Sequence, residues 1–365
     1  MTSATLSKRR LQLTQRQIIT GLFTLFGALF AYVLFNAVIG GQCDGRCLIG
    51  TLNQTVRSAA PIALAAYCGV ICERAGVINI GIEGMMLMGA MVGYLVDIYA
   101  FVALKDGGTD PVAAGNNARL LGLLCAVLSG GGLAALHAVA SIRFKTDQII
   151  SGTVVNILAV GLTGYVYRQY LAENPPTGPG TFPPFALPLL SQIPVVGDIF
   201  FTGQKPIVYL TLLLTVLLHV MLFQTKWGLR VRAVGEHPRA ADTLGINVIR
   251  TRYTNVIVGG LVAGLAGAWF TLEAVDVFNP LMTNGLGFIG LAAMIFGNWS
   301  PLGAFVGALI FGLGSSVTST ISIFRPDIPS QFPQMLPYLL TMIVLTGVVG
   351  RATPPAADGQ PYEKQ

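Results

Sequence analysis

The chain has 365 residues, of which 53% are hydrophobic and only 10% are charged, and its mean hydropathy is +0.68. Soluble domains usually carry about a quarter charged residues, so this composition excludes a soluble enzyme and predicts a multi-pass membrane protein. The net charge of +6 does not indicate a nucleic-acid partner, because the basic residues gather at the edges of apolar segments. Membrane lipid is the expected surrounding.

The chain carries no recognisable cofactor or catalytic motif. Its five cysteines form no Cys-x-x-Cys pair and no cluster with histidine, so no metal site is expected. No Gly-x-x-x-x-Gly-Lys-[Ser/Thr] loop occurs, so we expect no ATP or other cofactor on this chain. The absence of Gly-x-Ser-x-Gly and His-Glu-x-x-His motifs argues against an intramembrane enzyme, and no catalytic residue is predicted.

Ten apolar segments are candidates to cross the membrane, since a span needs about 20 mostly apolar residues. The eighth is too short for a regular crossing and predicts a half-helix paired with irregular backbone. Residues 1–17 form a basic N-terminus, 18–350 the membrane domain, and 351–365 a polar tail that we expect to be disordered. The ten segments are Ile18–Ile39, Leu48–Cys72, Gly76–Ala100, Leu120–Ala140, Ile149–Tyr167, Pro206–Phe223, Asn255–Val275, Leu286–Phe296, Pro301–Ile323 and Met335–Val349.

The basic residues set the expected orientation. With ten crossings, fifteen of the 22 Lys and Arg residues lie on the side of the N-terminus and the tail. Because positive charge is retained in the cytoplasm, both termini are predicted to be cytoplasmic in a bacterial inner membrane. The proline-rich segment 172–205 is then external, where it serves either as a stiff spacer or as a docking rim for an outside partner.

Cys43 and Cys47 also lie outside in this orientation. They can form a disulfide there, although so short a spacing on a helix is expected to strain the bond.

A stretch from Glu73 to Asp97 predicts part of a translocation path. Asn79 and Glu83 lie one helical turn apart in an otherwise apolar, glycine-rich segment. An ionisable residue at membrane depth usually faces a bundle interior or a water-filled path, and glycines allow a helix to break where it lines a cavity. The alternative is a tightly packed helix with Glu83 near the headgroups.

The inner loop 224–253 predicts a short amphipathic helix. Pro238 suits a first helical turn and Gly245 a C-terminal cap. Such a helix between two spans could enter a groove on another protein, or its charges could merely satisfy the positive-inside bias. The residues expected to act in coupling are Gly235, Glu236, Pro238, Arg239, Ala240, Ala241, Asp242 and Gly245.

Four blocks resemble permease subunits of ATP-binding-cassette importers: residues 73–86 (ERAGVINIGIEGMM), 144–156 (FKTDQIISGTVVN), 234–246 (VGEHPRAADTLGI) and 287–312 (GFIGLAAMIFGNWSPLGAFVGALIFG). The resemblance spans about Leu48 to Val349. The chain resembles the nucleoside and simple-sugar branch of the branched-chain amino-acid permease group. Its first block resembles the second of two permease types that pair in nucleoside importers. The N-terminal extension, the cysteine-bearing loop and the proline-rich loop depart from the family pattern.

The resemblance implies an all-α membrane fold of about ten spans with approximate inverted repeats and broken helices. It implies an ATPase subunit that binds ATP and Mg²⁺, a second permease chain and an external solute-binding protein. It assigns the substrate path to Asn79, Glu83, Asn156 and Asn284, whose polar groups suit sugar or nucleoside hydroxyls. For Asn156, hydrogen bonding between helices is an equal alternative.

The solute is expected to be a nucleoside, then a free purine or simple sugar. The alternatives are a branched-chain amino-acid permease of the same class and an ion-coupled transporter acting alone, although such a transporter would need more deep carboxylates or histidines than Glu83 supplies.

Overall fold

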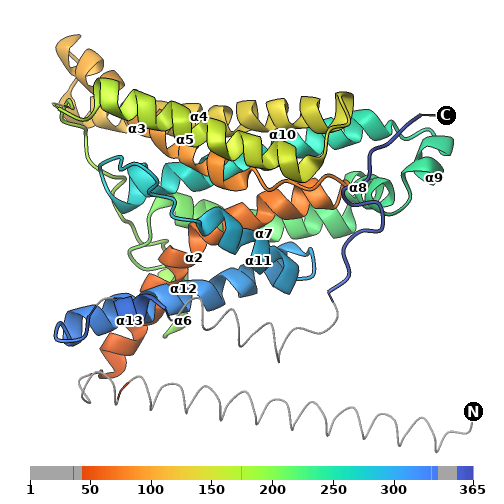
Figure 1. Cartoon of the computed structure of the whole chain (residues 1–365). Coiled ribbons are helices and arrows are strands. Elements are labelled where there is room, and N and C mark those ends of the chain that lie inside the picture. The colour runs from red at the N-terminus through yellow and green to blue at the C-terminus, as the bar shows by residue number, and fades with distance from the viewer. Residues whose placement is uncertain (1–35, 37–42, 174, 330, 336–351, 365) are drawn as a thin grey trace, which may run out of the picture.

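The computed structural model describes residues 36, 43–173, 175–329, 331–335 and 352–364, and these fold as a bundle of packed helices (Figure 1). In the described residues no β-strand forms beyond an isolated bridge between Phe185 and Gln204. The long helices are α2 (Gly45–Glu73), α3 (Ile82–Asp106), α4 (Pro111–Ala138), α5 (Gln148–Tyr170), α7 (Pro206–Gln224), α10 (Val248–Ala268) and α12 (Pro301–Phe324). The shorter ones are α6 (Val196–Phe200), α8 (Lys226–Glu236), α9 (Pro238–Thr243), α11 (Leu286–Phe296) and α13 (Gln331–Gln334).

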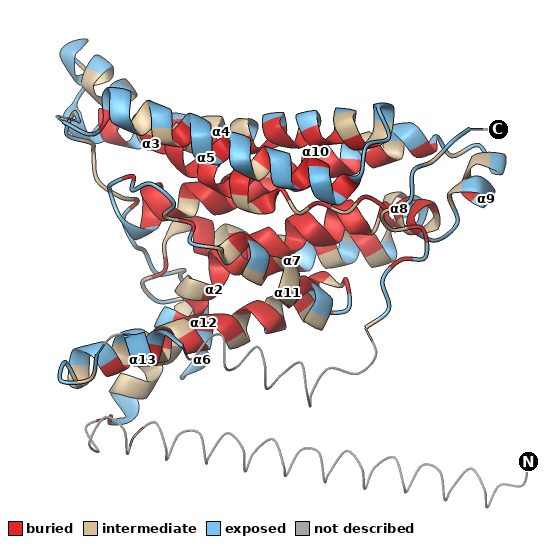
Figure 2. Cartoon of the chain, viewed as in Figure 1, coloured by how far each residue is buried: buried red, intermediate tan, exposed pale blue. Residues whose placement is uncertain are grey.

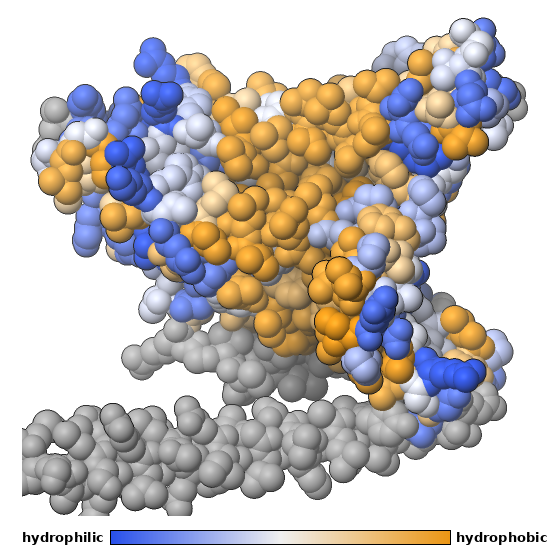
Figure 3. Space-filling model, turned by 180° about the vertical axis from the view of Figure 1, so that it is seen from behind, coloured by the Kyte–Doolittle hydropathy of each residue, from blue (hydrophilic) through white to orange (hydrophobic). Residues whose placement is uncertain are grey.

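Seven of the described helices are long and apolar enough to cross a membrane. They correspond to the predicted second to seventh and ninth segments, and α11, with 11 residues, confirms the predicted short eighth segment. The predicted segments Ile18–Ile39 and, except for Met335, Met335–Val349 lie outside the described residues. A broad apolar surface separates two polar ends (Figure 3), as expected for a protein surrounded by lipid.

Most long helices begin at a side chain that caps the first turn. Asp110 and Asp147 accept hydrogen bonds from the first amides of α4 and α5, and Ser300 does so for α12. Pro111 and Pro301 follow two of these caps, where a missing N–H costs nothing. Helices α3 and α11 have no such local cap, because the residues before them are Gly81 and Gly285.

Helix α2 forms the centre of the bundle, and 89% of its most apolar 18-residue stretch is buried. It contacts α10, α11 and α12 along its length, and the buried residues concentrate around it (Figure 2). Helices α3, α4 and α10 approach closely through glycines: a Cβ added to Gly89 of α3 would lie 2.6 Å from the carbonyl oxygen of Gly264 in α10. Small residues at membrane depth permit this close packing.

Helix α3 begins later than predicted, at Ile82 rather than Gly76. After α2 ends at Glu73, the chain makes a turn at Gly76, whose φ of +80° favours glycine, and then runs without helical structure through Asn79. Helix α11 is likewise preceded by a non-helical segment, residues 275–285. In addition, α4 ends in a π-helical turn (Val139–Arg143) and so does α10 (Trp269–Ala274).

The two polar ends of the bundle carry different segments (Figure 1). We name the two ends after the roles that the sequence predicts for them: the end with α8, α9 and the C-terminal tail is the coupling-loop end, and the end with the start of α2 and the proline-rich segment is the outer end. The proline-rich segment packs over the outer end, where the Phe182 amide donates to the Leu272 carbonyl and the Leu187 amide to the Phe201 carbonyl.

A disulfide joins Cys43 and Cys47 at the outer end, with 5.1 Å between the Cα atoms. The sequence-based expectation of strain assumed that both residues lie on the helix. Cys43 instead precedes the N-cap residue Asp44, so that it reaches the first turn of α2 from non-helical backbone. The separation lies in the normal range for disulfides.

We therefore predict that thiol alkylation of the unfolded chain will modify three cysteines before reduction and all five after it. The three free cysteines are Cys68, Cys72 and Cys125. Intact mass after maleimide treatment measures this directly, and a Cys43→Ser, Cys47→Ser chain should show three modifications in both states. Five modifications without reduction would contradict the pairing.

Candidate functional site

The Glu83 carboxylate binds the start of α11. Thr283 donates its hydroxyl to Oε1 at 2.6 Å, the Gly285 amide donates to the same oxygen at 2.8 Å, and the Gly287 amide donates to Oε2 at 2.7 Å. Glu83 lies in the first turn of α3, so one side chain joins the starts of two helices that are about 200 residues apart in the chain. We call this arrangement the Glu83 clasp.

The clasp supplies what α11 lacks locally. The first amides of a helix have no partner within it, and a helix that begins at membrane depth cannot rely on water to satisfy them. Gly285, with φ of +80°, offers no capping side chain. A carboxylate both accepts these hydrogen bonds and interacts favourably with the positive end of the helix dipole.

The start of α3 is stabilised by asparagines in the same manner. Asn156 of α5 accepts a hydrogen bond from the Gly84 amide at 2.8 Å and donates one to the Ile80 carbonyl at 3.0 Å. Asn79 accepts from the Gly81 amide at 3.0 Å, and its NH₂ group faces the sulfur atoms of Cys68, Cys72 and Met85.

Of the four residues predicted to line the path, three therefore hold broken helices in place. Asn79 is fully buried, and the polar atoms of Glu83 and Asn156 are bound by backbone groups. Only Asn284, which precedes α11, is exposed. All four lie near the starts of α3 and α11, but the contacts of Asn79, Glu83 and Asn156 favour a structural role over direct contact with a solute, and the path itself stays a prediction.

The clasp lies deep in the bundle. Gly290 of α11 packs against Ala65 of α2, and Gly69 of α2 packs against Met294, so α11 runs beside the last part of α2. The Glu83 clasp is about one helical turn before Gly290, well away from both ends of the 29-residue α2.

We predict that Glu83→Ala loosens α11 while the rest of the bundle remains folded. Removing the carboxylate leaves the Gly285 and Gly287 amides without their acceptor, which should increase hydrogen exchange in residues 285–288 at least about tenfold. Hydrogen exchange with mass spectrometry measures this, and Asp106→Ala at the far, exposed end of α3 is the matched control. Unchanged exchange in α11 would show that the clasp does not stabilise it.

The predicted inner helix is present as α9, with Pro238 in its first turn and Gly245 after it in the left-handed region (φ +81°). Two of the predicted coupling residues lie outside the exposed face of α9. Glu236 is the last residue of α8, not a residue of α9, because the chain bends at His237. Ala241 is buried against Val234 and Val248 and holds α9 to α8 and α10, so Arg239, Ala240 and Thr243 form the exposed face.

The coupling-loop end is connected to α11. Gly235 packs against the backbone of Arg74, and the Arg74 guanidinium donates to the carbonyls of Trp299 (2.8 Å) and Asn298 (3.1 Å) in the turn between α11 and α12. The Trp299 indole donates to Glu73 at 2.5 Å. Helix α11 thus contacts the coupling-loop end at its C-terminus and Glu83 at its N-terminus.

The C-terminal tail, predicted to be disordered, is instead packed over this end. The Ala357 amide donates to the Gly235 carbonyl at 2.9 Å, the Ala356 amide donates to Glu236 at 3.1 Å, and Arg252 donates to the Gln360 carbonyl at 2.7 Å. Composition did not reveal this, because the tail is held mainly through its backbone. The tail and α9 form the two walls of a groove.

Asp358 makes the packing of the tail sensitive to pH. Burial raises the pKa of its carboxyl to about 6, and the groups that face it are the Glu73 carboxyl and the Arg252 guanidinium. A carboxyl whose pKa is raised in the docked state favours docking below its ordinary pKa, near 4, and this contribution is lost as the pH rises through about 6.

We predict that the tail becomes more mobile between pH 5 and pH 7, and that Asp358→Asn removes this response. A nitroxide attached at Lys364→Cys, in a Cys125→Ser background, reports the mobility by electron paramagnetic resonance. Glu363→Gln is the control: Glu363 is exposed and its pKa is lowered by Lys145, so its neutralisation should leave the response in place. Equal mobility in the wild-type chain across this range would contradict the assignment to Asp358.

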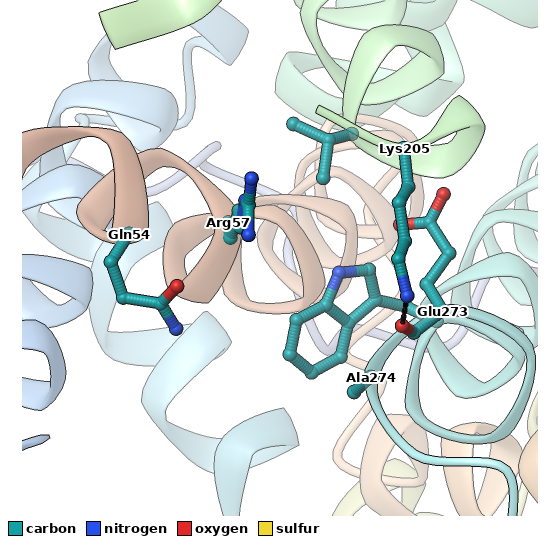
Figure 4. A pocket seen from close by; sticks show the side chains of 7 residues that line it. Gln54, Arg57, Lys205, Glu273 and Ala274 are labelled. Carbon is teal, nitrogen blue, oxygen red and sulfur yellow. Dashed lines mark hydrogen bonds between the residues drawn. The ribbon is translucent and has the colours of Figure 1, made fainter. Parts of the chain in front are cut away.

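A polar pocket at the outer end was not predicted from the sequence. It has a volume of about 200 Å³ and lies between α2, the start of α7 and the π-helical turn that ends α10. Gln54 and Arg57 lie on one side and Lys205 and Glu273 on the other (Figure 4). Glu273 lies near the end of the predicted segment Asn255–Val275. The sequence did offer one signal for this pocket: Arg57 and Glu273, like Glu83, are charged residues inside apolar segments.

Comparison with known proteins decides the family. Residues 51–345 match the family described as the permease component of branched-chain amino acid transport systems. The chain belongs to this permease family. It is 40% identical to the guanosine ABC transporter permease NupQ of Bacillus subtilis, over 85% of this chain and 95% of that protein. It is 38% identical to the nucleoside ABC transporter permease NupC of Lactococcus lactis, over 84% and 94% of the two chains.

Another guanosine ABC transporter permease of Bacillus subtilis, NupP, is only 23% identical, over 80% of each chain. The permease therefore resembles one guanosine permease of that organism much more than the other. No solved structure matches the chain.

Proposed function

We propose that this permease is the membrane-spanning subunit of an ATP-driven importer that carries nucleosides into a bacterial cell. The observation that carries the proposal is the extent of the similarity to two nucleoside permeases. The matched family region includes both helices of the Glu83 clasp and the α8–α9 segment, so the similarity covers path and coupling elements together. Free purines and simple sugars are the alternatives within the class.

The remaining architecture follows from this proposal. The proposal includes the architecture expected from the sequence, with about ten spans, approximate inverted repeats and both termini in the cytoplasm. The coupling-loop end then faces the cytoplasm, where a separate ATPase subunit binds ATP and Mg²⁺. A second, different permease chain completes the path, which the unequal similarity to NupQ and NupP supports. A binding protein delivers the solute at the outer end.

Helix α11 is suited to carry motion between the ATPase and the path. Its C-terminal turn is bound by Arg74, against which Gly235 at the end of α8 packs. Its N-terminus is bound by Glu83 of α3. When the ATPase displaces α8 and α9, α11 and α3 shift together as one body, which changes access to the path by rigid-body movement. The permease itself performs no chemistry.

We predict that Ala240→Trp uncouples ATP hydrolysis from transport. Ala240 lies on the exposed face of the short helix α9, and a large side chain there should prevent the close approach that a partner groove requires. The measurement is solute-stimulated ATPase activity and guanosine uptake in vesicles that contain the assembled transporter. We expect uptake to fall about tenfold or more, the equivalent of about 1.4 kcal/mol in the coupling interaction.

Ala103→Trp is the matched control, since Ala103 is also exposed but lies in α3 at the opposite end. It tests whether an added tryptophan disturbs insertion or assembly in itself. If Ala240→Trp retains both wild-type hydrolysis and wild-type uptake, α9 does not contact the ATPase, and the inner loop is only a solvated basic surface.

A further inference from the structure

The residues first assigned to the path have few free polar groups, whereas the outer pocket has several. The Glu83 oxygens, the Asn156 amide and the Asn79 amide are bound within the chain, so they have little left to offer a solute. Nucleoside selectivity needs unoccupied donors, acceptors and an aromatic surface in one cavity. The pocket lined by Gln54, Arg57, Lys205, Val208, Trp269, Glu273 and Ala274 offers the exposed Gln54 amide, an acceptor on Glu273 and the Trp269 indole.

Glu273 leaves one carboxylate oxygen available. Its side chain is 3% exposed, and Oε1 accepts a hydrogen bond from the Ile207 amide. Oε2 is buried and has no hydrogen-bond partner in the part of the chain that the structure describes. A buried acceptor without a donor is costly, so a ligand hydroxyl that donates to Oε2 would be bound favourably.

The positive groups of the pocket are already engaged. The Arg57 guanidinium donates to Gln204 at 3.1 Å and to the Gly203 carbonyl at 2.6 Å. The Lys205 ammonium donates to the Thr181 hydroxyl at 2.8 Å and to the Glu273 carbonyl. These bonds hold the proline-rich segment and α7 around the pocket and occupy several donors of the two cations.

Two further side chains of the pocket suit contacts with a nucleoside. Trp269 begins the π-helical turn, and its half-buried indole lines the cavity, where a planar base can stack on it. Gln54 is exposed and can donate and accept at the edge of a base. Carboxylates recognise ribose hydroxyls in other nucleotide-binding proteins, a role that Glu273 Oε2 can take here. A π-helical turn at a functional site is a common occurrence.

We propose that this pocket binds the nucleoside at the outer end, with the base on Trp269, a ribose hydroxyl donating to Glu273 and Gln54 at the edge of the base. This inference rests on the proposed function and names where the solute first contacts this chain. The pocket is lined by α2, the start of α7 and the turn that ends α10, whereas α9 lies at the coupling-loop end (Figure 1), so the solute would bind there before the α3–α11 body moves.

The test compares guanosine with 2′,3′-dideoxyguanosine in vesicles that contain the assembled transporter and saturating binding protein. Because the same binding protein delivers both solutes in every vesicle, a change in the ratio of the two uptake rates reports a change in the selectivity of the permease. We expect Glu273→Gln to bring the ratio close to one. Trp269→Leu and Gln54→Ala should lower uptake of both solutes about fivefold or more, as expected for a lost stacking or amide contact.

Tyr165→Leu is the control, because it removes an exposed aromatic side chain from α5 that does not line the pocket. If the Glu273→Gln variant fails to assemble, the Gln54→Ala variant still tests the pocket, because Gln54 is exposed and serves no packing role. Wild-type rates and ratio in the Gln54, Trp269 and Glu273 variants would overturn the pocket while leaving the nucleoside permease intact. A wild-type transporter that takes up neither guanosine nor any other nucleoside would overturn the proposed function instead.

Discussion

The fold depends on how a helix can begin in the middle of a membrane. Helix α11 starts beside the buried part of α2, where water cannot satisfy its first amides, and the Glu83 carboxylate accepts hydrogen bonds from two of them. The charge of Glu83 is acceptable at this depth because the same amides and the helix dipole stabilise it. A deep carboxylate without hydrogen-bond donors would be costly, and so would a deep helix start without acceptors.

This arrangement gives α11 two anchored ends. Its N-terminus is bound to α3 through Glu83, and its C-terminal turn is bound to the end of α2 through Arg74 and Trp299. Gly235 and the tail lie directly against that second anchor, beside α9. A short, rigid helix fixed at both ends is suited to transmit a displacement over the distance between the coupling-loop end and the middle of the bundle.

The sequence predicted the features that depend on local chemistry. Asn79 and Glu83 in a glycine-rich apolar segment indicated the break before α3, and Pro238 with Gly245 indicated α9. The sequence did not identify the partner of Glu83, because the Gly285 and Gly287 amides are backbone groups about 200 residues away and have no side-chain signature.

The same limit, that long-range contacts leave no local sequence signature, explains why the sequence predicted neither the docked tail nor the outer pocket. The tail is polar and contains prolines, and its docking depends on the Gly235 carbonyl and on Arg252, which composition does not encode. Trp269 and Glu273 share a cavity with α2 because α10 ends in a π-helical turn, a feature without a reliable sequence signal. Long-range packing therefore decides which polar side chains are bound within the chain and which line the outer pocket.

The most direct test of the account is affinity purification of this chain from detergent-solubilised membranes of the cell that produces it, followed by mass spectrometry. The account predicts that an ATPase subunit and a second, different permease purify with it, and that guanosine uptake by the reconstituted complex stops when ATP is replaced by a non-hydrolysable analogue. Purification of the chain alone, together with guanosine uptake driven by an ion gradient without ATP, would contradict it.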